Sequence, residues 1–411
     1  MSRCAVHFTS AIRCLFVVMT ISVSFGGGDS TTAAAQGVAD EVTIGHGLTD
    51  EELAEGWISL FDGRSLFGWR EAADANFRVE NEAIVVDEGE VGLLRTTTQF
   101  SAYRLRLEFQ SDADTNSGVF LQTSPRPTDV NADCYELNIA PSDNPFPTGS
   151  LVGRQKYDQA GHRDQWRTFD VVVQNGVVEI TLDGEKLYKY ESPRPLGRGY
   201  IGLQHNQGRV AFRKIRLKPL GLKSLFNGTD LAGWKEYPEM ASKFSVTAGG
   251  ELHVENGRGQ LESELSFGDF VMQLQCMTHA PRLNSGIFFR CVPGSTMDGY
   301  ESQIHNGFVD GDRTKPEDCG TGGIFRRQNA RFVVANDQEW FHQTIIAEGP
   351  HMAAWVNGHQ VSDWTDNRSP DVNPRRGLRT EPGTVMIQGH DPTTNISFRG
   401  IYAAETAPRN R

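Results

Sequence analysis

The sequence predicts an all-β protein that contains two similar β-sandwich domains in tandem. Three observations indicate this fold: one pattern of residues occurs twice, short runs of alternating apolar and polar residues recur in both copies, and no long segment has a helical period of 3.6 residues. A chain of 411 residues is long enough for two or three domains, each with its own core. Many short strands in domains of this size favour two-sheet sandwiches or jelly rolls.

Composition and charge narrow the range of partners. Charged residues make up 22% of the chain, an ordinary share for a globular protein, so wholesale disorder is excluded. The net charge of −12 argues against binding to nucleic acid and to anionic membrane surfaces, because both need a basic surface. A neutral or polar small molecule is therefore the expected partner.

The first 35 residues have the pattern of a cleavable signal peptide. Arg3 and Arg13 precede an apolar run of eleven residues at 15–25, which is too short to span a bilayer, and the small residues at 33–35 fit a cleavage site. No later stretch approaches 18 apolar residues. We therefore expect a periplasmic or secreted protein without membrane insertion, in which residues 36–55 form a linker.

Four cysteines remain after the predicted cleavage, at positions 134, 276, 291 and 319. They allow three pairings, and the sequence does not choose among them. A bridge between Cys291 and Cys319 or between Cys276 and Cys291 is one alternative, and free buried thiols are the other. No spacing typical of a structural zinc site occurs.

A duplication divides the rest of the chain into a first copy at 56–220 and a second copy at 221–405. The matching segments, first copy before second, are 56–63 and 221–228, 116–120 and 284–288, 135–136 and 300–301, and 211–215 and 397–401. Matches that keep their order over some 160 residues indicate two copies of one domain.

Strand patterns recur at matching places in the two copies. Apolar residues alternate with polar ones over 103–109 and again over 270–276, which predicts half-buried strands. In the first copy, the turn signals Asn175-Gly176 and Asp183-Gly184 divide 169–190 into a three-stranded meander. A matching hairpin around Asn357-Gly358 is expected in the second copy.

Polar side chains gather on three predicted strands of the second copy. In an extended strand, alternate residues share a face, so residues two apart can line one side of a sheet. The residues that share a face are Glu301, Gln303 and His305 on the first strand, Asn284 and Arg290 on the second, and Gln388 and His390 on the third. Such carboxylate, amide, imidazole and guanidinium groups can bind the hydroxyls of a sugar and move a proton, although a solvated outer face remains the alternative.

The first copy lacks most of these groups. It has Gln122, Ala140 and Asn206 at the positions of Arg290, His305 and His390. The carboxylate is kept, because Glu136 occupies the position of Glu301. We therefore expect chemistry in the second copy and a binding or structural role for the first.

Several motifs of the second copy resemble those of the 3-keto-disaccharide hydrolase family. They lie at 225–234, 284–290, 299–304, 321–326, 357–366 and 387–391. The resemblance covers essentially all of the second copy and, more weakly, the first. It implies a concanavalin-A-like jelly roll that acts on glycosides already oxidised at C3 by a separate dehydrogenase.

This resemblance gives the candidate residues specific roles. A ketone at C3 acidifies the proton at C2, so Glu301 or His390 is expected to act as the base. Arg290 is expected to stabilise the enediolate, with Arg326 as a second candidate. The expected substrate contacts are Asn284, Tyr300, Gln303, His305, Gln388 and Trp340. A divalent metal bound by Glu301, His305 or His390 is an open alternative. Whether the enzyme is a hydrolase or a lyase is also open.

Two other functions remain open from the sequence. A two-carboxylate glycosidase needs two acids that flank the bond, and Asp363 and Asp366 are candidates for the second acid. A non-catalytic carbohydrate-binding protein built of two modules is the other alternative.

Overall fold

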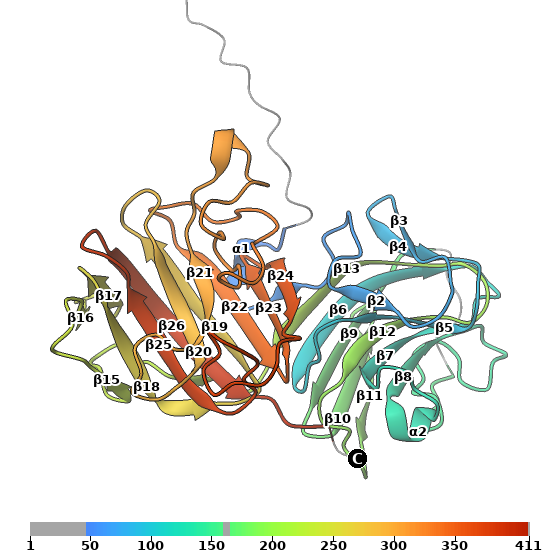
Figure 1. Ribbon diagram of the computed structural model, residues 1–411. Coiled ribbons are helices and arrows are strands. Elements are labelled where there is room, and N and C mark those ends of the chain that lie inside the picture. The colour runs from blue at the N-terminus through green and yellow to red at the C-terminus, as the bar shows by residue number, and fades with distance from the viewer. Residues whose placement is uncertain (1–46, 159–164, 410–411) are drawn as a thin grey trace, which may run out of the picture. The chain divides into compact units, whose positions relative to one another are not determined.

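The computed structural model describes residues 47–158 and 165–409, which form two β-sandwiches, one from each copy (Figure 1). The predicted fold class, jelly-roll sandwiches in tandem, is confirmed. The predicted signal peptide lies outside the described residues. Within them, no helix combines the length and apolar character needed to cross a membrane.

The first sandwich consists of a sheet of eight strands and a sheet of five. The larger sheet contains, in spatial order, β11 (Glu185–Glu191), β10 (Val177–Leu182), β9 (Arg167–Gln174), β6 (Tyr103–Ser111), β13 (Val210–Pro219), β4 (Ala83–Val86) and β3 (Arg78–Glu80), and β1 (Ile58–Ser59) also pairs with β13. The smaller sheet contains β2 (Trp69–Glu71), β5 (Gly92–Thr96), β12 (Tyr200–His205), β7 (Ser117–Thr123) and β8 (Tyr135–Ile139).

The second sandwich repeats this strand order. Its larger sheet contains β16 (Lys243–Val246), β17 (Leu252–Glu255), β26 (Asn395–Glu405), β19 (Phe270–Thr278), β22 (Phe341–Glu348), β23 (His351–Val356) and β24 (His359–Thr365), and β14 (Lys223–Ser224) pairs with β26. Its smaller sheet contains β15 (Trp234–Lys235), β18 (Gly259–Phe267), β25 (Gly383–Gly389), β20 (Ser285–Cys291) and β21 (Tyr300–Ile304). Equal strand orders in both sandwiches support the duplication.

The alternation of apolar residues explains why these strands pair as they do. Strand β6 buries every second side chain, as predicted, and β19 continues the same pattern in the second copy. The meander of β9, β10 and β11 turns at Asn175-Gly176 and Asp183-Gly184, where both residues of each pair have positive φ. Trp69 and Trp234 donate equivalent hydrogen bonds, to the Leu60 carbonyl at 2.6 Å and the Leu225 carbonyl at 2.8 Å.

Helical segments are short. They are α1 (Asp50–Ala54), α2 (Val130–Asp133) and the 3-10 turn η1 (Val309–Gly311). Helix α1 lies inside the predicted linker 36–55, where Thr49 and Glu52 form a capping box. Glu52 also pairs with Arg216 of β13 at 2.5 Å, so this end of the linker packs on the first sandwich. The four described cysteines are free and buried, which agrees with the second alternative from the sequence.

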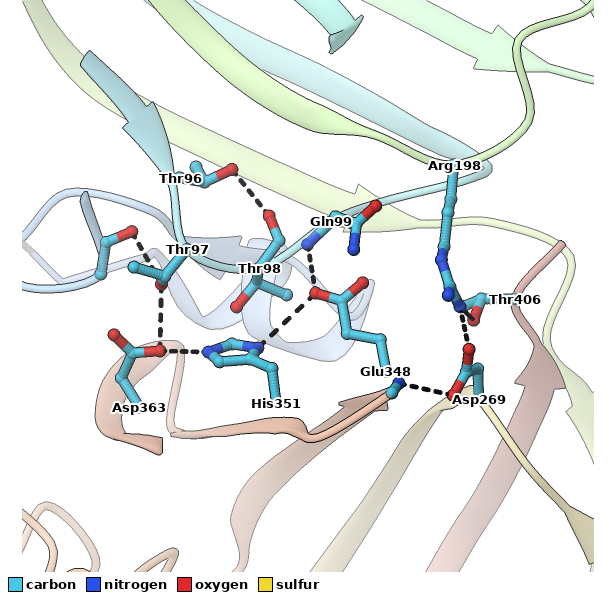
Figure 2. Close-up of polar contacts among 12 residues, drawn as sticks. Thr96, Thr97, Thr98, Gln99, Arg198, Asp269, Glu348, His351, Asp363 and Thr406 are labelled. Carbon is cyan, nitrogen blue, oxygen red and sulfur yellow. Dashed lines mark hydrogen bonds and ion pairs between the residues drawn. The ribbon is translucent and has the colours of Figure 1, made fainter. Parts of the chain in front are cut away.

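Polar contacts join the two sandwiches, whose described residues belong to one compact unit (Figure 2). The Thr97 hydroxyl donates to Asp363 at 3.0 Å, and the backbone N–H of Gln99 donates to Glu348 at 2.5 Å. His351 bridges the two acids, with its Nε2 at 2.5 Å from Asp363 and its Nδ1 at 3.6 Å from Glu348. The junction therefore buries an imidazole between two carboxylates.

This arrangement makes stability depend on pH. Burial alone lowers the pKa of His351, but its hydrogen bond to Asp363 and its ion pair with Glu348 outweigh burial and raise the pKa to about 9. A raised histidine pKa adds stability that is complete below about pH 6.5 and is lost as the pH rises through 9. Burial also raises the pKa of Glu348, so the stability that its protonated form adds is likewise lost as the pH rises above 4.5. We expect the free energy of unfolding to fall by up to about 3 kcal/mol between pH 6.5 and 9.

Urea unfolding of the wild type and of His351→Gln at several pH values measures this effect. The variant is expected to show a flatter pH profile over the same range, because glutamine does not titrate. Equal pH profiles for the two proteins would contradict the assignment.

Candidate active site

A cleft of about 740 Å³ opens on the smaller sheet of the second sandwich, and we call it the second-sandwich cleft. It is lined by Arg258, Asn284, Thr296, Met297, Asp298, Glu301, Gln303, Phe325, Arg326, Arg327, Arg375, Gln388 and His390. Strands β21 and β25 contribute Glu301, Gln303 and Gln388 to its floor, as the strand phases predict, and Asn284 lies just before β20. Six of the ten candidate residues line this cleft: Asn284, Glu301, Gln303, Arg326, Gln388 and His390.

Glu301 is a buried carboxylate on the cleft floor. Glu301 is 4% exposed, and the Arg375 guanidinium donates a hydrogen bond to its Oε2 atom at 2.8 Å. Burial raises the pKa of Glu301, and the nearby Arg375 guanidinium partly offsets this rise. A Cβ atom at Gly286, on the neighbouring strand β20, would lie 2.7 Å from the Glu301 Oε1 atom. Glycine at 286 therefore leaves the space that the carboxylate occupies.

Four arginines line the cleft, Arg258, Arg326, Arg327 and Arg375, and of these Arg375 contacts the carboxylate. Arg375 lies in the 366–382 segment between β24 and β25, where its Nε donates to the Met297 carbonyl at 3.3 Å and its guanidinium lies over the ring of Phe288. Arg375, Arg258 and Arg327 were not among the predicted site residues, because they lie outside the regular strands and no alternation marks them. The cleft thus combines one buried carboxylate with a concentration of positive charge.

Two amide side chains present unused acceptors in the cleft. The Gln303 Nε2 donates to Asn284 at 3.3 Å and to Asp318 at 3.2 Å, whereas its buried Oε1 has no hydrogen-bond partner. The Gln388 Oε1 is likewise buried and without a partner. Buried polar atoms are normally paired, so a ligand hydroxyl is a natural partner for each.

His390 follows the end of β25 at the mouth of the cleft. Its side chain is 42% exposed, and its Nδ1 lies 2.8 Å from the Asp391 carboxylate. The imidazole is close enough to lower the pKa of Glu301 by its charge. The two predicted base candidates therefore share one cleft, with Glu301 buried and His390 open to solvent.

Arg290 lies outside the cleft, so its predicted contact with the reacting sugar is wrong. The strand has a bulge there: the pairing of β20 with β25 shifts between Phe288 and Cys291, and Arg290 has a φ of 48°. This bulge turns the side chain away from the face of Phe288. Arg290 is fully buried, pairs with Asp269 at 2.9 Å and donates to three backbone carbonyls, those of residues 268, 349 and 379.

Three predicted substrate contacts also lie outside the lining of the cleft. Tyr300 faces the core, where its hydroxyl donates to Asp366 at 2.7 Å, because it is on the opposite face of β21 from Glu301. His305 lies beyond the end of β21, so the alternation no longer applies, and its Nδ1 accepts from the Gly307 N–H at 3.2 Å. Trp340 packs under the guanidinium of Arg399, 4.0 Å from its ring centre.

The metal alternative has little support from the geometry. Glu301 and His390 line the cleft, whereas His305 does not. In the described part of the chain, no three His, Cys, Asp or Glu side chains are grouped so that they could hold a metal ion. We therefore assign no step to a metal.

Comparison with solved structures found proteins that match less than half of this chain over nearly their whole own length. Two crystal structures from Parabacteroides distasonis, both provisionally named glycosyl hydrolases, match at 21% and 22% identity, with TM-scores of 0.38 and 0.36. They cover 42% and 45% of this chain and 98% and 100% of their own. The carbohydrate-binding module CBM66 from Bacillus subtilis matches at 15% identity with a TM-score of 0.31, and covers 42% of this chain and 96% of its own. No curated protein matched the sequence.

A family model settles the relationship that the motifs indicated. The model for the 3-keto-alpha-glucoside-1,2-lyase-like domain matches twice, over residues 56–218 and 221–403. These ranges agree with the two copies and cover most of the chain. The protein therefore belongs to the family of 3-keto-alpha-glucoside-1,2-lyase-like domains and carries two copies of that domain.

Proposed function

We propose that the second-sandwich cleft cleaves glycosides whose sugar carries a ketone at C3. The observation that carries this proposal is the buried Glu301 carboxylate on the floor of a cleft lined by four arginines. Burial raises the pKa of Glu301 and so makes its carboxylate a stronger base, while the arginines favour the negative charge that develops on the substrate.

The reaction begins with removal of the C2 proton. Glu301 takes this proton, and the electrons of the C–H bond move into an enediolate whose oxygen at C3 bears the negative charge. Arg375 and Arg326 stabilise that charge from the cleft wall. The enediolate then expels the oxygen at C1, and C1 and C2 become doubly bonded. His390, at the open end, supplies a proton to the leaving oxygen.

The last step decides between the two classes of enzyme. Release of the unsaturated ketone makes the enzyme a lyase, whereas addition of water to its double bond gives net hydrolysis. Gln303 and Gln388 accept hydrogen bonds from sugar hydroxyls through their unpartnered oxygens, and Asn284 positions Gln303. The substrate requires a preceding oxidation at C3, so a separate dehydrogenase must supply it. We propose that the protein is periplasmic or secreted, because residues 1–35 have the pattern of a signal peptide.

The geometry does not favour a two-carboxylate glycosidase. The candidate second acids from the sequence, Asp363 and Asp366, are absent from the cleft lining. Asp363 contacts His351 at the junction of the sandwiches, and Asp366 pairs with Arg368 at 2.8 Å. Asp298 is the other acid in the cleft, and it accepts a hydrogen bond from the Ser295 hydroxyl at 2.5 Å.

Incubation of the purified protein with 3-keto-glucosides and with unoxidised glucosides tests the proposed function. We expect NMR to show cleavage of the oxidised substrates alone, with equal rates in the presence and absence of a chelator. Cleavage of unoxidised glucosides would favour a glycosidase. Binding without any product would favour a carbohydrate-binding protein.

A further inference from the structure

The first sandwich has its own cleft at the equivalent place, and we call it the first-sandwich cleft. It has a volume of about 300 Å³ and is lined by Ala72, Ala73, Val91, Gly92, Leu93, Phe120, Arg126, Pro127, Thr128, Val130, Glu136 and Gln204. Glu136 and Gln204 correspond to Glu301 and Gln388 of the second sandwich. Unlike its counterpart, this cleft has mostly apolar walls.

The two clefts share a glutamate and a glutamine on their floors. Glu136 is 7% exposed and Gln204 is 9% exposed. The Gln204 Oε1 is buried and has no hydrogen-bond partner, as for Gln388. Asn138, which corresponds to Gln303, also has a buried Oδ1 without a partner, but it does not line this cleft. An acceptor left without a partner in a buried position indicates a missing ligand donor. The floor of the first-sandwich cleft is therefore built to hold hydroxyl groups.

The first-sandwich cleft has one arginine in its lining, Arg126, where the second-sandwich cleft has four. The register of β5 with β12 places Val91 where Arg258 stands, and the matching segments 148–155 and 321–328 place Gly153 where Arg326 stands. The long 366–382 segment that carries Arg375 corresponds to the shorter 192–199 segment. Without these groups, the first-sandwich cleft cannot stabilise an enediolate in the same way.

Glu136 consequently has no cation as a partner. The charged and titratable groups around it are Arg126, Asp133, Cys134, Arg154 and His205. Arg126 lies at the exposed rim, and Arg154 donates to the backbone carbonyls of Val130 and Asn131. No ion pair to Glu136 is formed by the residues of 47–158 and 165–409. Burial raises the pKa of Glu136 to about 7, although a hydrogen bond from Gln204 opposes the rise.

We propose that the first-sandwich cleft is a second, non-catalytic site for an uncharged glycoside with an apolar aglycone, and that it binds this ligand with Glu136 protonated. The choice of a sugar rests on the proposed function of the second sandwich, whose floor it shares. The apolar aglycone follows from the walls of the cleft, which include Leu93, Phe120 and Val130.

Proton uptake follows from the same geometry. A ligand that fills the cleft removes water from Glu136 and brings no positive charge, so it favours the neutral carboxyl and raises its pKa further. If the ligand raises this pKa by about one unit, then about half a proton is taken up per bound ligand at pH 7.5. The affinity of the site should fall about five- to ten-fold between pH 6 and 8.5.

Calorimetric titration of the full chain with phenyl α-glucoside tests the proposal. This probe is not oxidised at C3, so the proposed reaction does not consume it. Titrations in two buffers of different ionisation enthalpy give the number of protons taken up. We expect uptake by the wild type and by Glu301→Gln, no uptake by Glu136→Gln, and at least ten-fold weaker binding of methyl α-glucoside.

A second variant tests the proposal independently if Glu136→Gln does not fold. Val91→Arg places a cation at an exposed position that corresponds to Arg258, so it should lower the pKa of Glu136 and abolish the uptake. Uptake that persists in both variants, or that is lost in Glu301→Gln instead, would overturn the proposal, as would the absence of binding. Absence of 3-keto-glucoside cleavage would count against the proposed function alone, because these titrations do not measure turnover.

Discussion

Replacing Glu301 with glutamine is expected to lower kcat/KM for a 3-keto-glucoside by about 10²- to 10⁴-fold. Glutamine keeps the size of the side chain and can still contact Arg375, but it cannot take a proton from C2. Because the base acts in its ionised form, the rate of the wild type should rise with pH through a pKa above the usual glutamate value. Initial rates measured by NMR across pH 4–9 check both statements.

The matched control is Glu264→Gln on strand β18, where the side chain is exposed. This variant should retain the full rate. Glu301→Asp replaces Glu301→Gln in the test if the glutamine variant folds poorly. Aspartate keeps the charge, but its shorter side chain holds the carboxylate farther from the substrate, so we expect an intermediate loss of rate. A folded Glu301→Gln protein with the full rate would remove Glu301 from the mechanism.

Replacing Arg290 with methionine is expected to lower the free energy of unfolding by about 3–5 kcal/mol. The substitution removes the buried partner of Asp269 and leaves three backbone carbonyls without a donor, although Arg198 of the first sandwich still pairs with Asp269 (Figure 2). The loss should therefore appear as a lower urea midpoint.

An exposed arginine of the same sandwich provides the control. Arg282→Met removes a side chain that is 64% exposed and pairs with Glu317 at 3.2 Å, so its effect should stay within about 0.5 kcal/mol. If Arg290 acted on the substrate, Arg290→Met would instead lose turnover while its free energy of unfolding stayed near that of the wild type.

The sequence predicts the fold well, because repetition and alternation are local signals. Strands β6 and β19, the meander of the first copy and the hairpin at Asn357-Gly358 all follow from residue spacing of two and from turn residues that tolerate positive φ. The same spacing brought Glu301, Gln303 and Gln388 together correctly, since all three lie within regular parts of their strands.

The failures occur where regular strand geometry ends. Arg290 lies at a bulge, and the aligned Gln122 of the first copy also has a positive φ, of 49°, yet neither residue type signals a bulge. His305 lies just past the end of its strand. Arg375 reaches Glu301 from the 366–382 segment, and only the folded chain brings together residues 74 positions apart. The first copy has no counterpart of Arg375, and this difference between the copies was the one sign of its role in the sequence.

Cleavage of a 3-keto-glucoside in deuterium oxide tests most directly whether the C2 proton is removed in the second-sandwich cleft. If Glu301 removes this proton before the C1 oxygen leaves, unreacted substrate recovered early should contain deuterium at C2, or the protiated substrate should react several-fold faster than one deuterated at C2. Neither the incorporation of deuterium nor the rate difference should be observed with Glu301→Gln. Cleavage that retains hydrogen at C2 in the product, at equal rates for the two substrates, would contradict the proposed mechanism.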